Sequence, residues 1–264
     1  MNLKMKFLMI LNLILLLAAC TTTGGNNVEE ESALPPVPTL APAVPVTSQT
    51  IAHNGISLTY DPTLLDEVHI QDVPATSNEG MFEQPSPAHT WIGFVPDGIQ
   101  RDPRNHWFLA WEPAITVYNL NDFGSFASSD QYAQERLIQF QSLAVERPST
   151  ISEQIPVLVP INAGQIIRAQ VKWFEFGNGI GVRFVTQYDQ SANPINNEGL
   201  VYVFQGITTD GLHGVTAVFP LDAVGLPDSP AMAEPEYTNF IEHFEEAMTT
   251  VTDLLNAAPD EDFT

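Results

Sequence analysis

Alternating apolar and polar side chains predict an antiparallel hairpin over residues 165–189. The apolar members of the first strand are Ile167, Ala169, Val171 and Trp173, which alternate with polar Arg168, Gln170 and Lys172. Residues at alternate positions lie on one face of a strand, so this strand is half-buried. Asn178-Gly179 favours a type I′ turn. That turn predicts four cross-strand pairs: Trp173 with Phe184, Val171 with Thr186, Gln170 with Gln187, and Arg168 with Asp189.

A second hairpin is predicted over residues 200–221, with its turn at Asp210-Gly211. Counting outward from this turn along both strands pairs Tyr202 with Phe219, Phe204 with Ala217, Val203 with Val218, and Thr208 with His213. Both faces of these strands are largely apolar, and strands of this kind lie inside a sheet that is covered on both sides. We therefore expect them at the centre of the sheet.

Helical spacing of apolar residues predicts two helices. The first covers about 129–146, where Ser128 and Gln131 resemble a capping box, and it ends at Arg147-Pro148. The second closes the chain. Its predicted apolar stripe consists of Tyr237, Phe240, Ile241, Phe244, Met248, Val251, Leu254 and Leu255. The opposite face is acidic and is expected to contact solvent.

Shorter apolar runs predict strands in the first half of the domain. These lie at 56–60, after the turn Asn54-Gly55, around Val68 and Ile70, at 91–95 and at 107–118. Residues 74–90, 96–106 and 148–164 are predicted as loops, since they are rich in proline and polar residues or lack a clear period. This element order predicts an α+β fold, with an antiparallel sheet and packed helices in a layered sandwich. The order is strands, a helix, a crossing loop, an antiparallel meander and a final helix.

The N-terminus has the pattern of an export signal. Two lysines precede an apolar run from Phe7 to Ala19, shorter than the roughly 20 apolar residues that span a bilayer. The next residues, Leu17-Ala18-Ala19-Cys20, resemble a bacterial lipobox. That resemblance implies cleavage before Cys20, lipidation of its thiol with fatty acyl groups such as palmitate, and anchoring outside the cytoplasmic membrane, in the cell membrane or an outer membrane. A plain secretory signal followed by a chance cysteine is the alternative.

Four segments follow from this pattern. Residues 1–19 are predicted as the signal peptide, 20–50 as a proline-rich disordered tether, 51–258 as a single domain, and 259–264 as an acidic tail. The tether contains no aromatic residue, and its proline-rich half favours extended polyproline II structure.

The element order over 51–258 resembles the Mog1/PsbP/DcrB-like fold, in which an N-terminal hairpin such as Asn54 to Tyr60 precedes the sheet. The segments Tyr188-Asp189-Gln190 and 202–211, with Asn196 between them, are similar to uncharacterised bacterial surface lipoproteins. These resemblances imply a fold and a location, and they carry no catalytic motif.

Charge narrows the class of partner. The 264 residues contain 32 Asp and Glu against 9 Lys and Arg, a formal net charge of -23. So negative a surface repels phosphate backbones, which argues against a nucleic-acid partner. The single cysteine excludes an internal disulfide framework and a cysteine-based zinc cluster.

The chain lacks the usual catalytic motifs, and we predict no cofactor and no metal site. It contains no G-x-S-x-G, no H-E-x-x-H and no phosphate-binding glycine loop. Its six histidines are dispersed, at positions 53, 69, 89, 106, 213 and 243.

Two groups of residues are candidates for binding. The first is the loop 189–199, whose side chains suit a sugar or a hard cation such as calcium; they are Asp189, Gln190, Asn193, Asn196, Asn197 and Glu198. A plain solvent-facing connection is the alternative, and the composition favours it. The second group is Arg168, Lys172 and Arg183, which could receive an anion or pair with acids such as Asp189; pairing is favoured because acids outnumber bases.

These observations predict a membrane-anchored extracytoplasmic lipoprotein that acts as a non-catalytic binding or assembly module for a protein or carbohydrate. Two alternatives remain open. One is a hydrolase that uses dispersed Asp and Glu residues, and the other is a solute receptor.

Overall fold

The structure is a computed structural model that describes residues 48–62, 68–76, 86–94, 113–127, 131–159, 161 and 163–263. The predicted signal peptide, the lipobox with Cys20 and most of the tether lie outside these residues. So do Ser128, His106 and most of the strand predicted at 107–118.

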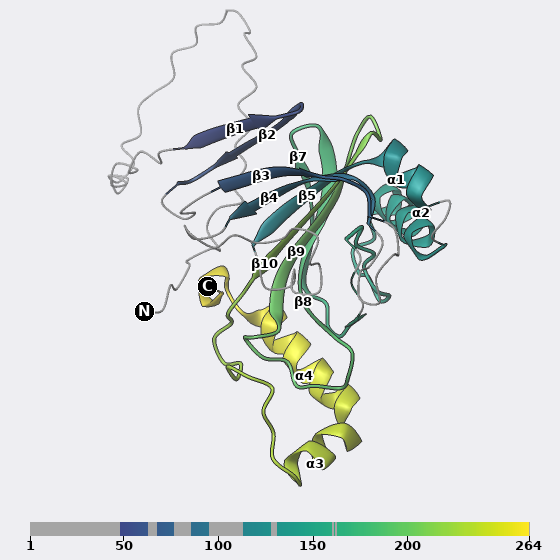
Figure 1. The fold of residues 1–264 in the computed structure, drawn as a ribbon. Coiled ribbons are helices and arrows are strands. Elements are labelled where there is room, and N and C mark those ends of the chain that lie inside the picture. The colour runs from purple at the N-terminus through teal and green to yellow at the C-terminus, as the bar shows by residue number, and fades with distance from the viewer. Residues whose placement is uncertain are drawn as a thin grey trace, which may run out of the picture.

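An antiparallel sheet of eight strands forms the centre of the fold (Figure 1), in the order β3-β4-β5-β10-β9-β8-β6, with β7 paired to β8. Its first three strands are β3 (Val68–Val73), β4 (His89–Phe94) and β5 (Ala114–Asn119). The others are β6 (Gly164–Gln165), β7 (Ala169–Phe176), β8 (Gly179–Asp189), β9 (Leu200–Thr208) and β10 (His213–Pro220). The α+β class with an antiparallel sheet and packed helices is therefore confirmed.

A separate two-stranded sheet precedes the large one. It consists of β1 (Gln49–His53) and β2 (Ile56–Tyr60), joined by a tight turn in which Asn54 and Gly55 have positive φ. The strand at 56–60 is confirmed. Strand β1 was not predicted, and it begins at Gln49, so the domain starts two residues inside the segment predicted as tether.

Helices α1 (Leu120–Ala127) and α2 (Gln131–Glu146) cover one face of the sheet. On this helical face, Phe140 and Ala144 of α2 pack with buried Phe184, Val203 and Val218. Helix α2 matches the predicted helix within the described residues. Helix α1 was missed, because it is short and carries Gly124, which has low helix propensity.

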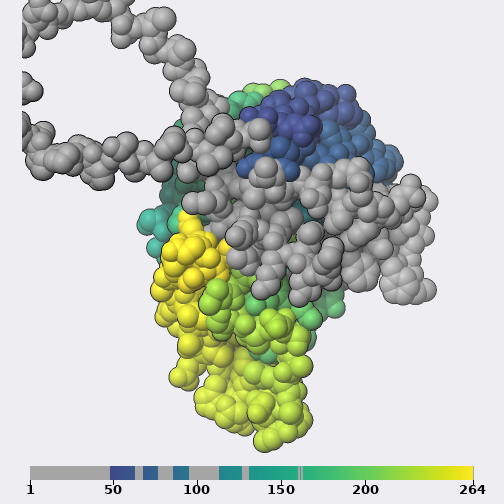
Figure 2. Space-filling model, turned by 90° about the vertical axis from the view of Figure 1, so that its left-hand side faces the viewer, coloured from purple at the N-terminus to yellow at the C-terminus, as the bar shows by residue number. Residues whose placement is uncertain are grey.

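The opposite face, which we call the hairpin face, is covered by two elements far apart in sequence. At one end, Ile51 and Leu58 of the β1–β2 hairpin pack against the cluster of Phe94, Phe204 and Phe219. At the other end, the C-terminal helices pack against the cluster that contains Val185 and Leu200. Figure 2 shows the hairpin and the C-terminal helices together on one side of the molecule.

The final predicted helix is two helices, α3 (Glu236–Glu242) and α4 (Phe244–Ala257). His243 between them has φ -118° and ψ 24°, outside the helical region. This break changes which residues face the sheet. Phe240, Met248 and Leu255 are buried as predicted, whereas Ile241 and Leu254 are 41% and 45% exposed.

The described part of the predicted acidic tail, residues 259–263, belongs to the domain. Asp260–Asp262 form a 3-10 turn, and the amide of Val224 donates a hydrogen bond to the carbonyl of Asp262 at 2.9 Å. Phe263 is 3% exposed and belongs to the core beneath α4. The domain therefore extends to Phe263 rather than to residue 258, because one aromatic side chain in this acidic segment reaches the core.

The β9–β10 hairpin has the predicted register. Tyr202 pairs with Phe219, Val203 with Val218, and Phe204 with Ala217. Gly211 in the connection has φ +70°, as the turn chemistry requires. Both strands lie inside the sheet, between β5 and β8, so the predicted central position is also confirmed.

The predicted register of the β7–β8 hairpin is wrong. Phe176 pairs with Gly179, so the turn residues are Gly177-Asn178, and Trp173 faces Val182 instead of Phe184. This shift also removes the predicted pairs of Val171 with Thr186 and of Arg168 with Asp189, and a bulge between Ala169 and Lys172 changes the register once more. Residue Gly179 explains the difference, because the ring of Phe176 packs where a side chain on Gly179 would stand. The glycine is needed inside the strand, not in the turn.

The bulge has a packing role of its own. Gln170 lies in it with φ +52° and does not face Gln187 as predicted. Its side-chain amide donates to the carbonyls of Leu255 at 2.8 Å and of Ala258 at 3.0 Å, at the C-terminal end of α4. Such carbonyls have no partner within their own helix. Gln170 therefore fastens the end of α4 to the edge of the sheet.

Candidate functional site

The loop 189–199 uses its polar side chains to hold itself together. The Asp189 carboxylate accepts hydrogen bonds from the amide of Ser191 at 3.1 Å and from the side chain of Asn193 at 2.9 Å. Asn196 is 2% exposed; its side chain donates to the carbonyl of Pro194 and accepts from the amide of Gly199, both at 2.9 Å.

The same loop is joined to the segment after β10. The side-chain oxygen of Asn197 accepts a hydrogen bond from the amide of Ala223 at 2.9 Å, and the amide of Glu198 donates to the carbonyl of Asp228 at 3.0 Å. Gln190 and Glu198 have exposed side chains. Across the described part of the chain, no three His, Cys, Asp or Glu side chains gather closely enough to hold a metal ion. The arrangement therefore suits a rigid connection better than a calcium site.

The predicted basic group divides into two parts. Arg168 lies before β7, and its guanidinium donates a hydrogen bond to the carbonyl of Ser152 at 3.1 Å. Lys172 and Arg183, which we call the basic pair, lie directly opposite each other on β7 and β8. The described residues show no ion pair between Asp189 and any of the three bases. The predicted pairing of these bases with Asp189 is therefore not seen in the described part of the chain.

Arg183 lies beside a partly buried tyrosine. Tyr202 lies next to it on β9, and its hydroxyl is inaccessible to solvent. Burial raises the pKa of Tyr202, an effect that the positive charge of Arg183 opposes. The hydroxyl therefore stays protonated at neutral pH. Because Val182 and Phe184 on either side of Arg183 pack on the helical face, Arg183 lies on the hairpin face.

A buried polar cluster, which the sequence did not reveal, lies at the start of β4. Ser86 and His89 are 0% and 6% exposed, and the His89 ring lies 5.4 Å from the ring of Tyr118. A serine near a histidine raises the question of a nucleophile and a base. However, the Ser86 hydroxyl and the Nδ1 of His89 both bond to the carbonyl of Pro87, at 3.3 and 2.8 Å. Burial lowers the pKa of His89. This geometry directs both groups toward a backbone acceptor and indicates a structural role.

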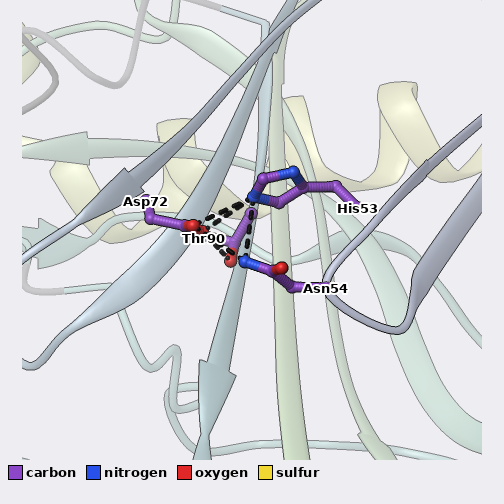
Figure 3. Close-up of polar contacts among 4 residues, drawn as sticks. All are labelled: His53, Asn54, Asp72 and Thr90. Carbon is purple, nitrogen blue, oxygen red and sulfur yellow. Dashed lines mark hydrogen bonds and ion pairs between the residues drawn. The ribbon is translucent and has the colours of Figure 1, made fainter.

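A second polar cluster joins the β1–β2 hairpin to the large sheet (Figure 3). The Asp72 carboxylate on β3 accepts hydrogen bonds from Asn54 at 2.8 Å, from Thr90 at 2.9 Å and from the Nε2 of His53 at 3.0 Å. We call these four residues the clasp. Because hairpin and sheet are separate β-sheets, the clasp provides a polar connection between them alongside the apolar contacts.

The clasp predicts a pH-dependent stability. The hydrogen bond from Thr90, followed by that from His53, lowers the pKa of Asp72. A carboxyl with a lowered folded-state pKa stabilises the fold above its unfolded pKa, near 3.9, and this contribution disappears as the pH falls through the folded value. We expect Asp72→Asn to be less stable than wild type at pH 7, with the difference shrinking below about pH 4. Urea unfolding at several pH values measures it.

Glu198→Gln is the matched control for the clasp, since Glu198 is an exposed acid whose side chain lies outside the clasp. Its difference from wild type should stay small at every pH. A difference between Asp72→Asn and wild type that stays constant from pH 7 to pH 3 would contradict the assignment.

Comparison with known proteins leaves the family open, because no protein-family model, curated protein or solved structure matches this chain. The resemblance to the Mog1/PsbP/DcrB-like fold therefore stays a prediction. No helix in the described ranges is long and apolar enough to cross a membrane.

Proposed function

We propose that this protein is an extracytoplasmic lipoprotein, anchored to a membrane through Cys20, whose folded domain is a non-catalytic binding or assembly module. The main support for the membrane anchor is the position of the cysteine. The chain has one cysteine, and it follows Leu17-Ala18-Ala19 directly at the end of the apolar run.

The organisation of the folded part supports this proposal. Strand β1 begins at Gln49, immediately after the proline-rich segment. A sheet with helices on both faces, preceded by a proline-rich segment whose composition favours an extended chain, suits a domain that meets its partner at a distance from the bilayer.

The geometry of the polar residues supports binding over catalysis. The loop 189–199 uses Asp189 and its asparagines for internal hydrogen bonds, and Ser86 and His89 both bond to the carbonyl of Pro87. The basic pair differs from these groups, because neither Lys172 nor Arg183 forms an ion pair with a carboxylate among the described residues.

Changing Cys20→Ser tests the anchor. We expect wild-type protein in the membrane fraction of a bacterial host, and Cys20→Ser in the soluble exported fraction, because several acyl chains together hold a protein on a bilayer. Thr22→Ser is the control and should fractionate with the membrane. Equal partitioning of Cys20→Ser and wild type, or a mature N-terminus at another residue by mass spectrometry, would overturn the proposal.

A further inference from the structure

The basic pair places two cations side by side on the hairpin face. In the observed register Lys172 is directly opposite Arg183, and residues so placed have Cβ atoms about 4.5–5.5 Å apart. Their neighbours Trp173 and Val182 pack on the opposite, helical face. Because side chains alternate along a strand, Lys172 and Arg183 both lie on the hairpin face.

Like charges directly opposite each other destabilise a sheet. The arrangement is unexpected in a chain that contains 32 acids and 9 bases. Neither cation forms an ion pair with a carboxylate among the residues that the structure describes. Arg147, in contrast, lies 3.9 Å from the carboxylate of Glu175.

Negative charges nearby offset the repulsion only in part. The C-terminal end of α4, fastened by Gln170, lies next to β7, and a helix C-terminus is equivalent to about half a negative charge. Asp260 is close enough to act on the hydroxyl of Tyr202. The cations carry two full positive charges, which exceed the negative charge of the helix end and of Asp260 together, so a net positive charge remains.

Aromatic rings border the pair on the side away from α4. Phe204 faces Arg183 across β8 and β9, and its ring centroid lies 5.0 Å from that of Phe174, two residues along β7 from Lys172. Phe204 is 8% exposed, while Phe174 is half-buried and remains partly accessible. A ligand that reaches the cations would therefore also contact an apolar surface.

We propose that the basic pair binds an oxyanion of the carboxylate class that carries an apolar group. The guanidinium of Arg183 suits bidentate bonding to a planar carboxylate, and the ammonium of Lys172 adds a compact charge. The apolar group packs against Phe174. This inference deepens the proposed function, because it names a ligand class for the module, but it does not depend on the membrane anchor.

Benzoate is the probe, and Cys20→Ser protein from the soluble exported fraction is the starting material, so that solubility does not require detergent. We expect saturable binding of benzoate by NMR titration, and a rise in melting temperature with benzoate concentration, since a ligand of the folded state stabilises it. Benzamide has the same shape without the charge and should not bind. Inorganic phosphate, which lacks the apolar group, should bind more weakly than benzoate.

Single substitutions assign the site. Arg183→Gln and Lys172→Gln should each weaken benzoate binding about tenfold or more, the effect of losing one hydrogen bond to a charged group. Arg168→Gln, which removes a base outside the pair, should change the affinity less than about twofold. Without ligand, Lys172→Gln should melt no lower than wild type, because it removes like-charge repulsion.

Three results would overturn the inference. They are benzamide binding as tightly as benzoate, unchanged affinity in both Arg183→Gln and Lys172→Gln, and phosphate binding more tightly than benzoate. A protein that fractionates as a lipoprotein and shows any of these results would retain the proposed function and lose this site. A protein that binds benzoate as expected but is not lipidated would retain this site and lose the proposed function.

Discussion

Replacing Gly181 by valine is expected to produce one of the two largest losses of stability in this protein. Gly181 lies in β8, opposite Gly206 of β9, and the ring of Phe204 packs where its side chain would stand. The backbone carbonyl of Gln205 is 2.7 Å from the same position, and a backbone atom of an internal strand cannot move aside cheaply. Forcing extra atoms into a packed core costs about 1–3 kcal/mol, and the backbone contact places this site at the upper end.

Urea unfolding monitored by circular dichroism measures this loss. Gly124→Ala is the control, because nothing lies within 4 Å of a side chain added there. Gly124 is inside helix α1, where alanine is favoured over glycine by about 0.5–1 kcal/mol, so the control should be at least as stable as wild type. A Gly181→Val protein with an unfolding midpoint equal to that of wild type would show that the packing on the hairpin face is wrong.

Replacing Gln205 by leucine is the second substitution with a large expected effect. Gln205 is 0% exposed, and its side-chain oxygen accepts hydrogen bonds from the amide of Leu158 at 2.9 Å and from the hydroxyl of Thr216 at 2.6 Å. Its side-chain nitrogen donates to the carbonyl of Val215 at 3.1 Å. A buried group left without its partner costs about 1–3 kcal/mol, so losing these bonds together should cost about 3 kcal/mol or more.

The expected loss has a local signature. Since Gln205 holds the crossing segment through the amide of Leu158, hydrogen exchange of that amide should accelerate more than exchange elsewhere in the sheet. Gln139→Leu on the exposed side of α2 is the matched control and should change the unfolding free energy by less than about 0.5 kcal/mol. Unchanged protection at Leu158 in Gln205→Leu would contradict this role.

The two hairpins show why local pattern predicts one register and fails for the other. In β9 and β10, the turn at Asp210-Gly211 and the apolar pattern specify the same pairing, and the connection closes on itself, with the amide of Leu212 donating to the carboxylate of Asp210 at 2.9 Å. In β7 and β8, Asn178-Gly179 is an equally strong turn signal. Packing of Phe176 over Gly179 instead places the turn at Gly177-Asn178, and a turn motif in the sequence does not reveal such a contact.

The candidate site could be predicted only in part. The bases Lys172 and Arg183 stand out in an acidic chain, so composition singled them out. Their facing positions depend on the shifted register, and the distance of Arg168 from the pair depends on the bulge. The clasp could not be predicted, because Asp72 and Thr90 are brought to Asn54 by the docking of two separate sheets.

The sequence by itself determined the α+β class, helix α2, the central β9–β10 hairpin and the expectation of an exported lipoprotein. Each follows from residues that are neighbours along the chain, where periodicity, turn chemistry or a short motif acts locally. Tertiary structure alone decided the β7–β8 register, the break at His243, the burial of Phe263 and the pairing of Lys172 with Arg183. These features depend on which surfaces meet when strands, helices and hairpin pack together, and close packing allows one arrangement where local preferences allow several.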